Sequence, residues 1–335
     1  MIITKTPFRM SFFGGGTDIA EFFKEYGGSV ISTTFDKYCY VNVRHLPRFF
    51  DYKNQVTYSK IERVNQTDEI AHPLVRNAMK YLDMHELIIT YDADLPARTG
   101  LGSSSSFAVG LLNAFYALKG KYADKKRLAD DAIYVERELC KEHGGWQDQI
   151  AASFGGLNRI DFTADGYRVS PVIISPVRKR LLNRRLMLFF TGFSHFSAEI
   201  QASAKNQIKN KKDQLCEMKQ LVDEAQQILS DSRADLDKFG VLLDHTWQLK
   251  QQISDKISNE HICRYYQAAR RAGALGGKLL GAGGGGFLLF YVPEEKQEAV
   301  RNALEGLLFV PFEFEDSGTE IIYYSPEEYF VEGTK

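Results

Sequence analysis

The chain has 335 residues, of which 44% are hydrophobic and 13% aromatic, and this is enough apolar material for packed cores. At about 150 residues per domain, the length predicts two domains. With 42 basic and 43 acidic residues the net charge is −1, which gives no general attraction to nucleic acid or to an anionic membrane. The four cysteines are too far apart for a Cys-x-x-Cys zinc motif. The sequence shows no secretory signal pattern and no apolar run of membrane-spanning length, so we expect a cytoplasmic protein.

The first half of the chain mixes strand and helix patterns, which predicts an α/β (α+β) fold. The expected elements here are strands at 2–13, 38–44 and 87–91, helices at about 104–119 and 125–142, and a hairpin formed by 157–161 and 167–173.

The second half begins after a basic stretch at residues 175–180, where we expect the chain to cross between domains. The expected elements beyond it are a strand at 186–191, a long amphipathic helix at 197–231, a helix at about 259–273 and a strand at 287–292. No internal repeat or low-complexity tract interrupts this pattern. We therefore predict domains at 1–178 and 179–335.

The most informative segment is residues 96–106, where Gly100 and Gly102 precede four consecutive serines and an apolar helical pattern. Glycines let the backbone approach a ligand and direct its N–H groups inward, and the helix behind adds free donors and its positive dipole end. Serine hydroxyls can cap the helix or hold a metal. The segment therefore suits a phosphate group, although no Walker A motif occurs and a simple helix-capping turn remains the alternative.

Two acidic residues follow glycine-rich segments. In residues 7–18 a strand pattern ends in three glycines and leads to Asp18, whose carboxylate can accept two sugar hydroxyls; a turn with a solvated aspartate is the alternative. In residues 144–152, Asp148 begins an expected helix, where the helix dipole favours a carboxylate and where a plain N-cap is the alternative.

A third acidic residue, Glu136, lies on the expected helix at 125–142. A glutamate on a helix surface is usually solvated. Magnesium bound together with nucleotide phosphates, however, needs only one or two protein oxygens, and Glu136 with a serine of the phosphate loop would supply them.

Residues 278–287 contain a formal G-x-G-x-x-G match at Gly281, Gly283 and Gly286. The dinucleotide-binding fingerprint follows a strand and opens a helix, whereas here we expect a helix, then the loop, then a strand. We therefore expect this loop to close over phosphates or substrate from a second domain, with a flexible connector as the alternative.

These segments, in this order, resemble the three motifs of the GHMP kinases, the family of galactokinase, homoserine kinase, mevalonate kinase and phosphomevalonate kinase. The motifs correspond to residues 7–18, 96–106 and 278–287 and cover nearly the whole chain. The resemblance implies ATP and Mg²⁺ as cofactors. It also implies a two-domain GHMP kinase fold, with an N-terminal, ribosomal-protein-like ATP-binding domain that has a left-handed β-α-β unit, and a ferredoxin-like C-terminal domain.

The resemblance also implies roles for individual residues. Asp148 would face the acceptor hydroxyl as the catalytic acidic residue, and Arg9 would lie near the transferring phosphoryl group. Ser104 and Glu136 would hold the metal. The residues implied to bind the ATP phosphates are Gly100, Leu101, Gly102, Ser103, Ser104 and Ser105. Those implied to bind the acceptor are Gly15, Gly16, Asp18, Trp146, Asp148, Gly283, Gly284 and Gly285.

The first motif departs from that of galactokinase-like members, which usually read Gly-Glu-His-x-Asp, because residues 14–18 read Gly-Gly-Gly-Thr-Asp. This form, and the Gly-Trp-Gln-Asp-Gln of residues 145–149, look like the heptose 7-phosphate kinase branch. The resemblance thus implies phosphorylation of O1 of D-glycero-D-manno-heptose 7-phosphate to the 1,7-bisphosphate. Three alternatives remain: a fucokinase-like or other aldose 1-kinase, a silent sugar and nucleotide sensor, and a family decarboxylase.

The expected partners are thus ATP and a small sugar phosphate, with neither nucleic acid nor membrane. A sugar that carries a distal phosphate needs cations to bind it. The candidates, among which the spacing does not select, are Lys37, Arg44, Arg98, Arg178, Lys179, His45 and His195.

Overall fold

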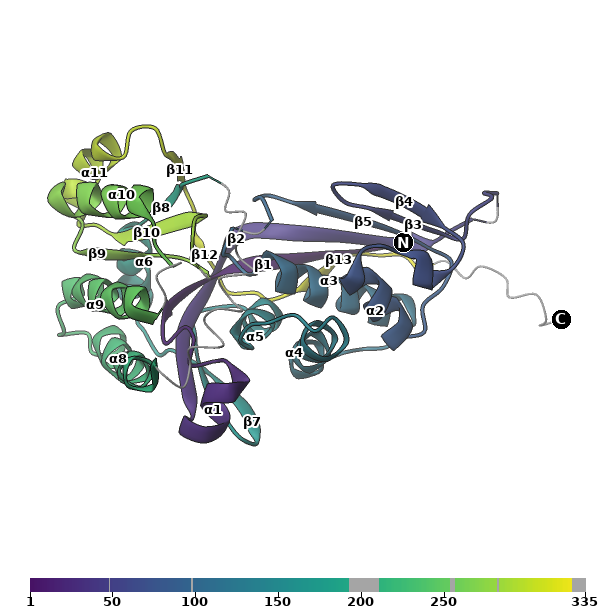
Figure 1. The fold of residues 1–335 in the computed structure, drawn as a ribbon, viewed down its shortest axis with the longest axis horizontal. Helices are drawn as coiled ribbons and strands as arrows, with labels where there is room; N and C mark the ends of the chain where they lie inside the picture. Colours follow the sequence, from purple (N-terminus) through teal and green to yellow (C-terminus); the bar gives the residue numbers. More distant parts are fainter. Residues whose placement is uncertain (48, 98, 193–210, 254–256, 282, 327–335) are drawn as a thin grey trace.

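The computed structural model describes residues 1–47, 49–97, 99–192, 211–253, 257–281 and 283–326. These residues form two β-sheets with helices packed on them, one at each end of an elongated molecule (Figure 1). The larger sheet is built mainly from the first half of the chain, and the smaller one from the second half.

The larger sheet has the strand order β13-β1-β2-β5-β3-β4, with β6 and β12 also pairing with β2, and β7 with β6. Its strands are β1 (Ile2–Phe13), β2 (Gly28–His45), β3 (Asn54–Thr57), β4 (Ile61–Val64), β5 (Leu87–Ala93), β6 (Asn158–Thr163), β7 (Gly166–Pro171), β12 (Phe314–Glu315) and β13 (Glu320–Tyr324). The long strands β1 and β2 run antiparallel and hold the sheet together.

The helices beside this sheet include one that is buried on nearly every side. They are α1 (Ala20–Tyr26), α2 (Pro73–Tyr81), α3 (Ser103–Leu118), α4 (Lys125–Tyr134) and α5 (Gln147–Phe154), with the short turns η1 (Thr67–Glu69) and η2 (Val135–Leu139). All of α3 except Ser104 is buried, because the helix lies between β1 and β2 on one side and α5, α4 and α2 on the others. A helix that is apolar all round is stable only in such a place.

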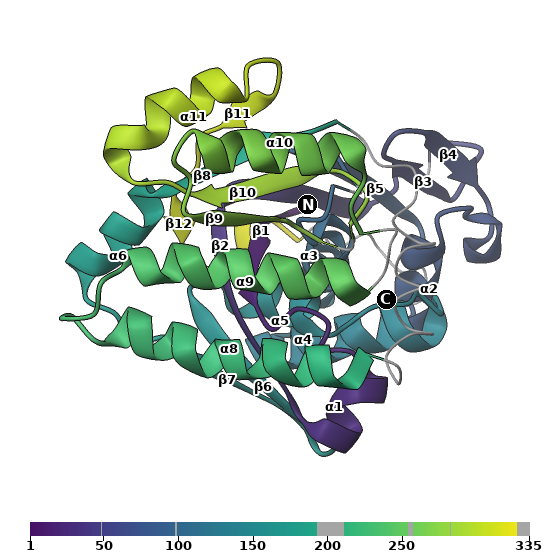
Figure 2. The same ribbon diagram turned by 60° about the vertical axis from the view of Figure 1, so that its left-hand side comes forward.

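The smaller sheet has the strand order β11-β8-β10-β9, all antiparallel. The elements of this half are α6 (Pro176–Arg184), β8 (Leu186–Phe190), α8 (Lys212–Ser230), α9 (Asp237–Ile253), α10 (Glu260–Arg271), β9 (Gly276–Leu279), β10 (Phe287–Tyr291), η4 (Glu294–Lys296), α11 (Gln297–Ala303) and β11 (Leu308–Val310). Figure 2 shows α8 and α9 on one side of this sheet and α10 and α11 on the other. In chain order the strands lie 4-1-3-2, the arrangement of a ferredoxin-like sheet, so the expected fold class is confirmed.

The two halves share one continuous core. Phe12 and Phe13 at the end of β1 pack edge-to-face on Phe239 of α9, with ring centroids 5.4 and 5.0 Å apart. This packing brings the first glycine motif, which follows β1, to the junction with the second half of the chain.

Several sequence predictions need correction. The strand at 38–44 is only the second part of β2, which already begins at Gly28. The crossing at 175–180 is helical, since Ser175 caps the N–H of Arg178 and Pro176 occupies the first turn of α6. The loop at 278–287 follows a strand, β9, and not a helix. Of the helix predicted at 197–231, residues 197–210 lie outside the described residues, and the rest contains α8.

The boundary at residue 178 also needs revision at the far end of the chain. Strands β12 and β13 pair with β2 and β1 and thus belong to the larger sheet, although the expected second domain, 179–335, includes them. The left-handed β-α-β unit stays a prediction.

Candidate active site

Arg9 and Asp148 form an ion pair at the junction of β1 and α5. The guanidinium donates from Nε to Oδ1 at 2.7 Å and from Nη2 to Oδ2 at 2.8 Å. The Arg9 side chain is almost fully buried, whereas that of Asp148 is 24% exposed. Because Asp148 lies in the first turn of α5, the helix dipole adds to the stabilisation of its carboxylate. The pair is fixed in position and still has carboxylate surface open to a ligand.

The phosphate loop lies directly beside this pair. The Arg9 side chain donates from Nη1 to the carbonyl of Gly100 at 2.8 Å, and the Arg9 backbone N–H donates to the carbonyl of Leu101 at 3.1 Å. Gly102 precedes α3 in the left-handed region, and a Cβ placed on it would lie 3.4 Å from Oδ2 of Asp148. The structure thus brings Asp148 beside the N-terminus of α3.

The loop's four serines differ in their surroundings. Ser103 is buried, whereas Ser104 is exposed at the first turn of α3. The hydroxyl of Ser105 donates to Glu136 at 2.8 Å, and that of Ser106 donates to the carbonyl of Pro7 at 2.9 Å. The N-terminal turn of α3 therefore presents its open side at Ser104.

The third glycine loop packs against the phosphate loop. A Cβ on Gly281 would clash with Gly100, and one on Gly286 would clash with the carbonyl of Thr99. Only glycine permits this approach of two backbones. Gly283 and Gly284 lie against Ile257, and Gly285 is half-buried, so the described contacts of these three do not reach Asp18.

Asp18 is buried between the first motif and the start of α5. Its carboxylate accepts the backbone N–H groups of Gly16 at 2.9 Å and Gln147 at 3.2 Å, and its carbonyl accepts the N–H of Trp146 at 3.1 Å. Burial first, and then the negative charge of Asp148, raise the pKa of Asp18. Gly145 touches this carboxylate so closely that no side chain would fit there.

Two polar atoms beside Gly15 have no hydrogen-bond partner among the described residues: the hydroxyl of Ser11 and the amide oxygen of Gln147. Both side chains are buried. A Cβ on Gly15 would lie 3.6 Å from Oγ of Ser11 and 3.8 Å from Nε2 of Gln147. Buried polar atoms are rarely left unpaired, so these mark a place where a polar ligand can bind. Neither residue was predicted from the sequence, because a lone serine in a strand gives no signal of this kind.

Glu136 is 1% exposed and lies in the π-helical turn η2. Its carboxylate accepts the hydroxyl of Ser105 at 2.8 Å and the amide of Gln149, both neutral groups. A buried carboxylate without a described basic partner is costly, and a divalent cation would compensate for that cost. The residue therefore fits a metal, although its described serine partner is Ser105 and not Ser104.

Two lysines that the sequence did not single out also lie here. The amine of Lys250 in α9 donates to the carbonyls of Leu279 at 2.9 Å and Gly281 at 2.6 Å. That of Lys278, only 3% exposed, donates to the carbonyl of Phe12 at 2.9 Å. Lys278 is the only charged residue of the glycine-rich segment 278–287, which was a signal for it, whereas Lys250 lies on a mixed helix and gave none.

Most described candidates for binding a distal phosphate are engaged elsewhere. Lys37 donates to Asp36, Arg178 to the carbonyls of Ile228 and Ala234, and Lys179 to Asp316. Arg44 is exposed and His45 half-buried on β2. Arg98 and His195 lie outside the described residues.

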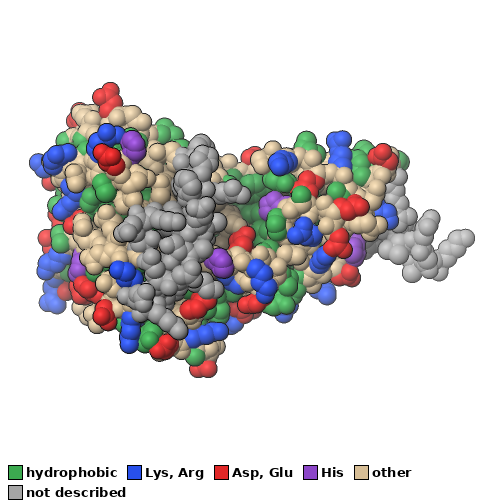
Figure 3. Space-filling view, in the orientation of Figure 1, with side chains coloured by type: hydrophobic (Ala, Val, Ile, Leu, Met, Phe, Trp, Pro, Cys, Tyr) green, Lys and Arg blue, Asp and Glu red, His purple; other side chains and the backbone are tan. Residues whose placement is uncertain are grey.

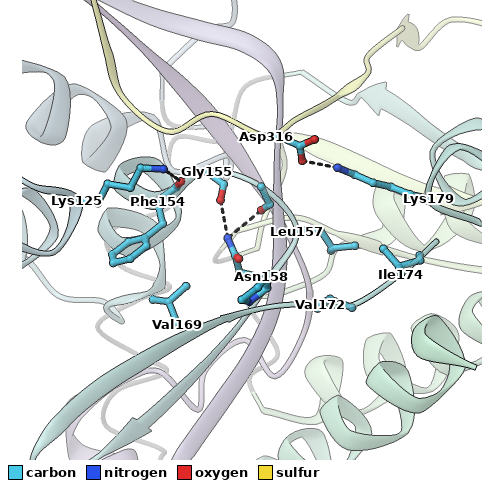
Figure 4. A pocket seen from close by; sticks show the side chains of 12 residues that line it. Lys125, Phe154, Gly155, Leu157, Asn158, Val169, Val172, Ile174, Lys179 and Asp316 are labelled. Atoms are coloured by element: carbon cyan, nitrogen blue, oxygen red, sulfur yellow. Dashed lines mark hydrogen bonds and ion pairs between the residues drawn. The ribbon is translucent and has the colours of Figure 1, made fainter. Parts of the chain in front are cut away.

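A separate pocket of about 460 Å³ lies between α5, the β6–β7 hairpin and the segment around Asp316 (Figure 4). Its basic groups already have partners, since Lys125 donates to the carbonyl of Phe154 at 2.7 Å and Lys179 pairs with Asp316. Its lining contains none of the residues predicted for catalysis.

The surface shows no single charged patch on the face drawn in Figure 3, where acidic and basic side chains are interspersed. None of the helices described has both the length and the apolar character needed to span a bilayer. Within the same residues, no three histidine, cysteine or acidic side chains gather as a metal cluster.

Comparisons with known proteins agree with this arrangement. The family model for the GHMP kinases N terminal domain matches residues 70–156, and that for GHMP kinases C terminal matches residues 221–308. The chain is 31% identical over 322 residues to D-glycero-alpha-D-manno-heptose 7-phosphate kinase of Campylobacter jejuni, covering 90% of this chain and 93% of that protein.

Two further relatives are more distant. The L-fucokinase/L-fucose-1-P guanylyltransferase of Bacteroides fragilis is 25% identical over 343 residues, which cover 89% of this chain and 35% of that protein. A solved structure of a D-glycero-D-manno-heptose 1-phosphate kinase from Bacteroides thetaiotaomicron superimposes with a TM-score of 0.78 at 22% identity, covering 96% of this chain and 99% of that one, and supports the fold. The chain therefore belongs to the GHMP kinase family and is an ATP-dependent sugar kinase.

Proposed function

We propose that this kinase transfers the γ-phosphoryl group of MgATP to the anomeric O1 hydroxyl of D-glycero-D-manno-heptose 7-phosphate, giving the 1,7-bisphosphate. The observation that carries the proposal is the Arg9–Asp148 pair, held beside Gly102 at the N-terminus of α3. In this arrangement Asp148 would serve the acceptor and Arg9 the phosphoryl group, side by side. The similarity to the Campylobacter jejuni enzyme supports this acceptor.

The donor side would be formed by Gly100 to Ser105. The free N–H groups and the positive dipole end of α3 favour bound phosphate, and the Arg9 guanidinium adds charge where the phosphoryl group is transferred. Phosphoryl transfer needs in-line positioning and charge neutralisation more than covalent assistance. These residues supply both requirements.

Mg²⁺ would be held by Glu136 with Ser104 or Ser105. The buried carboxylate of Glu136, whose described partners are neutral, fits a hard cation that takes one or two protein oxygens. When bound, the metal supplies positive charge on the phosphate oxygens.

On the acceptor side, Asp148 would accept the hydrogen bond of the O1 hydroxyl and orient it toward the phosphoryl group. Its carboxylate would also accept the hydroxyl proton as a general base. This transfer is easier from an anomeric hydroxyl, because that group is more acidic than the hydroxyl of an ordinary alcohol. Asp18, Gly15, Gly16 and Trp146 would form the sugar pocket. The Ser11 hydroxyl and the Gln147 amide oxygen, which have no partner among the described residues, match a ligand rich in hydroxyl groups.

A second candidate is an aldose 1-kinase that acts on an unphosphorylated sugar, such as fucose. This candidate is favoured because Lys37, Arg178 and Lys179 already donate hydrogen bonds to other protein groups. These three side chains are therefore less available to bind a distal phosphate. It has the same donor site and the same roles for Arg9 and Asp148.

The deciding experiment is a coupled assay of ADP release with heptose 7-phosphate, mannose, fucose, galactose and sedoheptulose 7-phosphate. We expect the highest kcat/KM with the heptose phosphate, and a product whose new phosphate shows the phosphorus NMR signal and acid lability of an anomeric phosphate. A preference for an unphosphorylated sugar would support the second candidate. Absence of sugar-dependent ADP release would contradict both.

A further inference from the structure

The amine of Lys250 lies where the two glycine loops meet. It donates to the carbonyl of Leu279, the last residue of β9, and to that of Gly281. Gly281 packs on Gly100, whose carbonyl accepts Nη1 of Arg9 at 2.8 Å. Lys250 and Arg9 therefore hold the two sides of one backbone contact, each from its own half of the chain.

Basic groups gather around this contact. Burial, and then the charge of Arg9, lower the pKa of Lys250 to about 7. Burial and then the charges of Lys250 and Arg9 hold the pKa of Lys278 well below its usual value, with only Asp18 acting in the opposite direction. Such a cluster of cations is unfavourable in free protein and becomes favourable when an anion binds beside it.

Other ionisable groups of α9 form hydrogen bonds or ion pairs with residues other than Lys250. Asp237 pairs with Arg185 and Tyr291, Asp244 with Tyr266 and Arg270, and His245 with Glu217 of α8. The described charged groups that act on Lys250 are thus Arg9 of β1 and Lys278 of β9, and the acidic groups beyond them are Asp148 and Asp18.

The amine of Lys250 has two described acceptors, the carbonyls of Leu279 and Gly281. An ammonium has three N–H groups, so the protonated side chain has one more donor than these two carbonyls accept. Protonation of Nζ adds a donor, and a phosphate oxygen forms a particularly strong hydrogen bond with a charged donor.

We propose that Lys250 is a positioning residue for the phosphate donor, holding the third glycine loop on the phosphate loop and taking up a proton when the triphosphate binds. The inference rests on the proposed assignment of Gly100 to Ser105 to the phosphates. The proton comes from solvent and joins the lone pair of Nζ, and no other bond is made or broken. Above about pH 7 the nucleotide-free protein has mostly neutral Lys250, and bound negative charge shifts it to the ammonium.

The test is calorimetric titration of the full chain with a non-hydrolysable ATP analogue and Mg²⁺ at pH 8, in two buffers of different ionisation enthalpy. The γ-phosphate is already deprotonated at this pH, so it contributes little to the buffer dependence. We expect wild type to take up a substantial fraction of one proton per bound analogue, and less at pH 6, where Lys250 is already charged. Lys250→Met should lose this uptake, and its KM for ATP should rise at least about tenfold, with the KM for the acceptor unchanged.

Two further variants distinguish this role from a structural one. Lys250→Arg keeps a permanent charge, so it should recover nucleotide affinity without the linked proton uptake. Lys60→Met, which removes an exposed lysine between β3 and β4, should behave like wild type in every measurement. The same buffer dependence in wild type and in folded Lys250→Met, or in wild type and Lys250→Arg, would overturn the proposal. The titration contains no sugar, so a wrong acceptor assignment would leave its outcome unaffected.

Discussion

Arg9 and Asp148, which are 139 residues apart in the sequence, meet through two parallel hydrogen bonds of 2.7 and 2.8 Å. A bidentate pair of this kind fixes both side chains and leaves the outer lone pairs of the carboxylate to a ligand.

Replacing Asp148 by Asn should lower kcat by at least about a hundredfold, because an amide cannot take the acceptor's proton and presents an N–H group to Arg9. Affinity for an ATP analogue should change little, since Asp148 would face the acceptor in the proposed function. Steady-state kinetics and calorimetry would measure the two effects. Asp161→Asn, which breaks a comparable pair with Arg159 at 2.8 Å on β6, is the control and should keep kcat. An unchanged kcat in Asp148→Asn would remove this residue from the chemistry.

Glu136→Gln should raise the Mg²⁺ concentration needed for half-maximal activity by at least about tenfold, because the variant loses the charge that would hold the metal. The matched control is Glu138→Gln, an exposed residue of the same turn that pairs with Lys141 at 3.5 Å. Comparing Ser104→Ala with Ser105→Ala then shows which hydroxyl completes the site. If the Mg²⁺ titrations of Glu136→Gln and wild type coincide, Glu136 is not a ligand.

Ser11→Ala should raise the KM for the sugar by about two- to tenfold and leave the KM for ATP unchanged, because it would remove the hydrogen bond that we propose to the acceptor. Ser153→Ala is a close control, since Ser153 is also buried and its hydroxyl also has no described partner, but it lies at the far end of α5. Equal effects of the two substitutions would argue against a sugar contact at Ser11.

Lys278 should make the stability of the nucleotide-free protein depend on pH. Its pKa is lowered in the folded protein by burial and by neighbouring positive charge, so between that pKa and about 10.5 the unfolded chain binds more protons than the folded one. The free energy of unfolding should therefore rise with pH across this range, by up to about 1.4 kcal/mol per pH unit for one group. Denaturant unfolding of wild type and Lys278→Met at pH 7, 8 and 9 would measure it. The variant should show a smaller slope, and an equal slope would mean that Lys278 is charged in the fold.

The sequence was most informative where short segments carry a local signal. The strand pattern at residues 2–13 predicted β1 with its observed bounds, and the Gly-Ser run predicted the start of α3 to within one residue. Elements whose residues form poor strands by themselves were not predicted. Gly-Gly-Lys-Leu of β9 is a strand only because it pairs with β10, and α9 shows too weak a pattern to separate it from its surroundings.

Within the site, motifs were predictable and contacts were not. Asp148 and Asp18 were identified from their positions in glycine-rich segments, and Arg9 from the family resemblance. Nothing local indicates that Arg9 would pair with Asp148. The acceptors of Lys250 are 29 and 31 residues away, and that of Lys278 is 266 residues away. The packing of the two sheets determines which atoms meet over such separations. No short sequence pattern indicates this packing.

The return of β12 and β13 to the larger sheet limits how this chain can be divided. Ile2 lies opposite Tyr324, so the earliest and latest described strands are neighbours. A fragment of residues 1–178 would leave β1 as a bare sheet edge, open to pairing with other chains and therefore prone to aggregate. During synthesis, likewise, the sheet that carries Arg9 can be completed only after most of the polypeptide has left the ribosome.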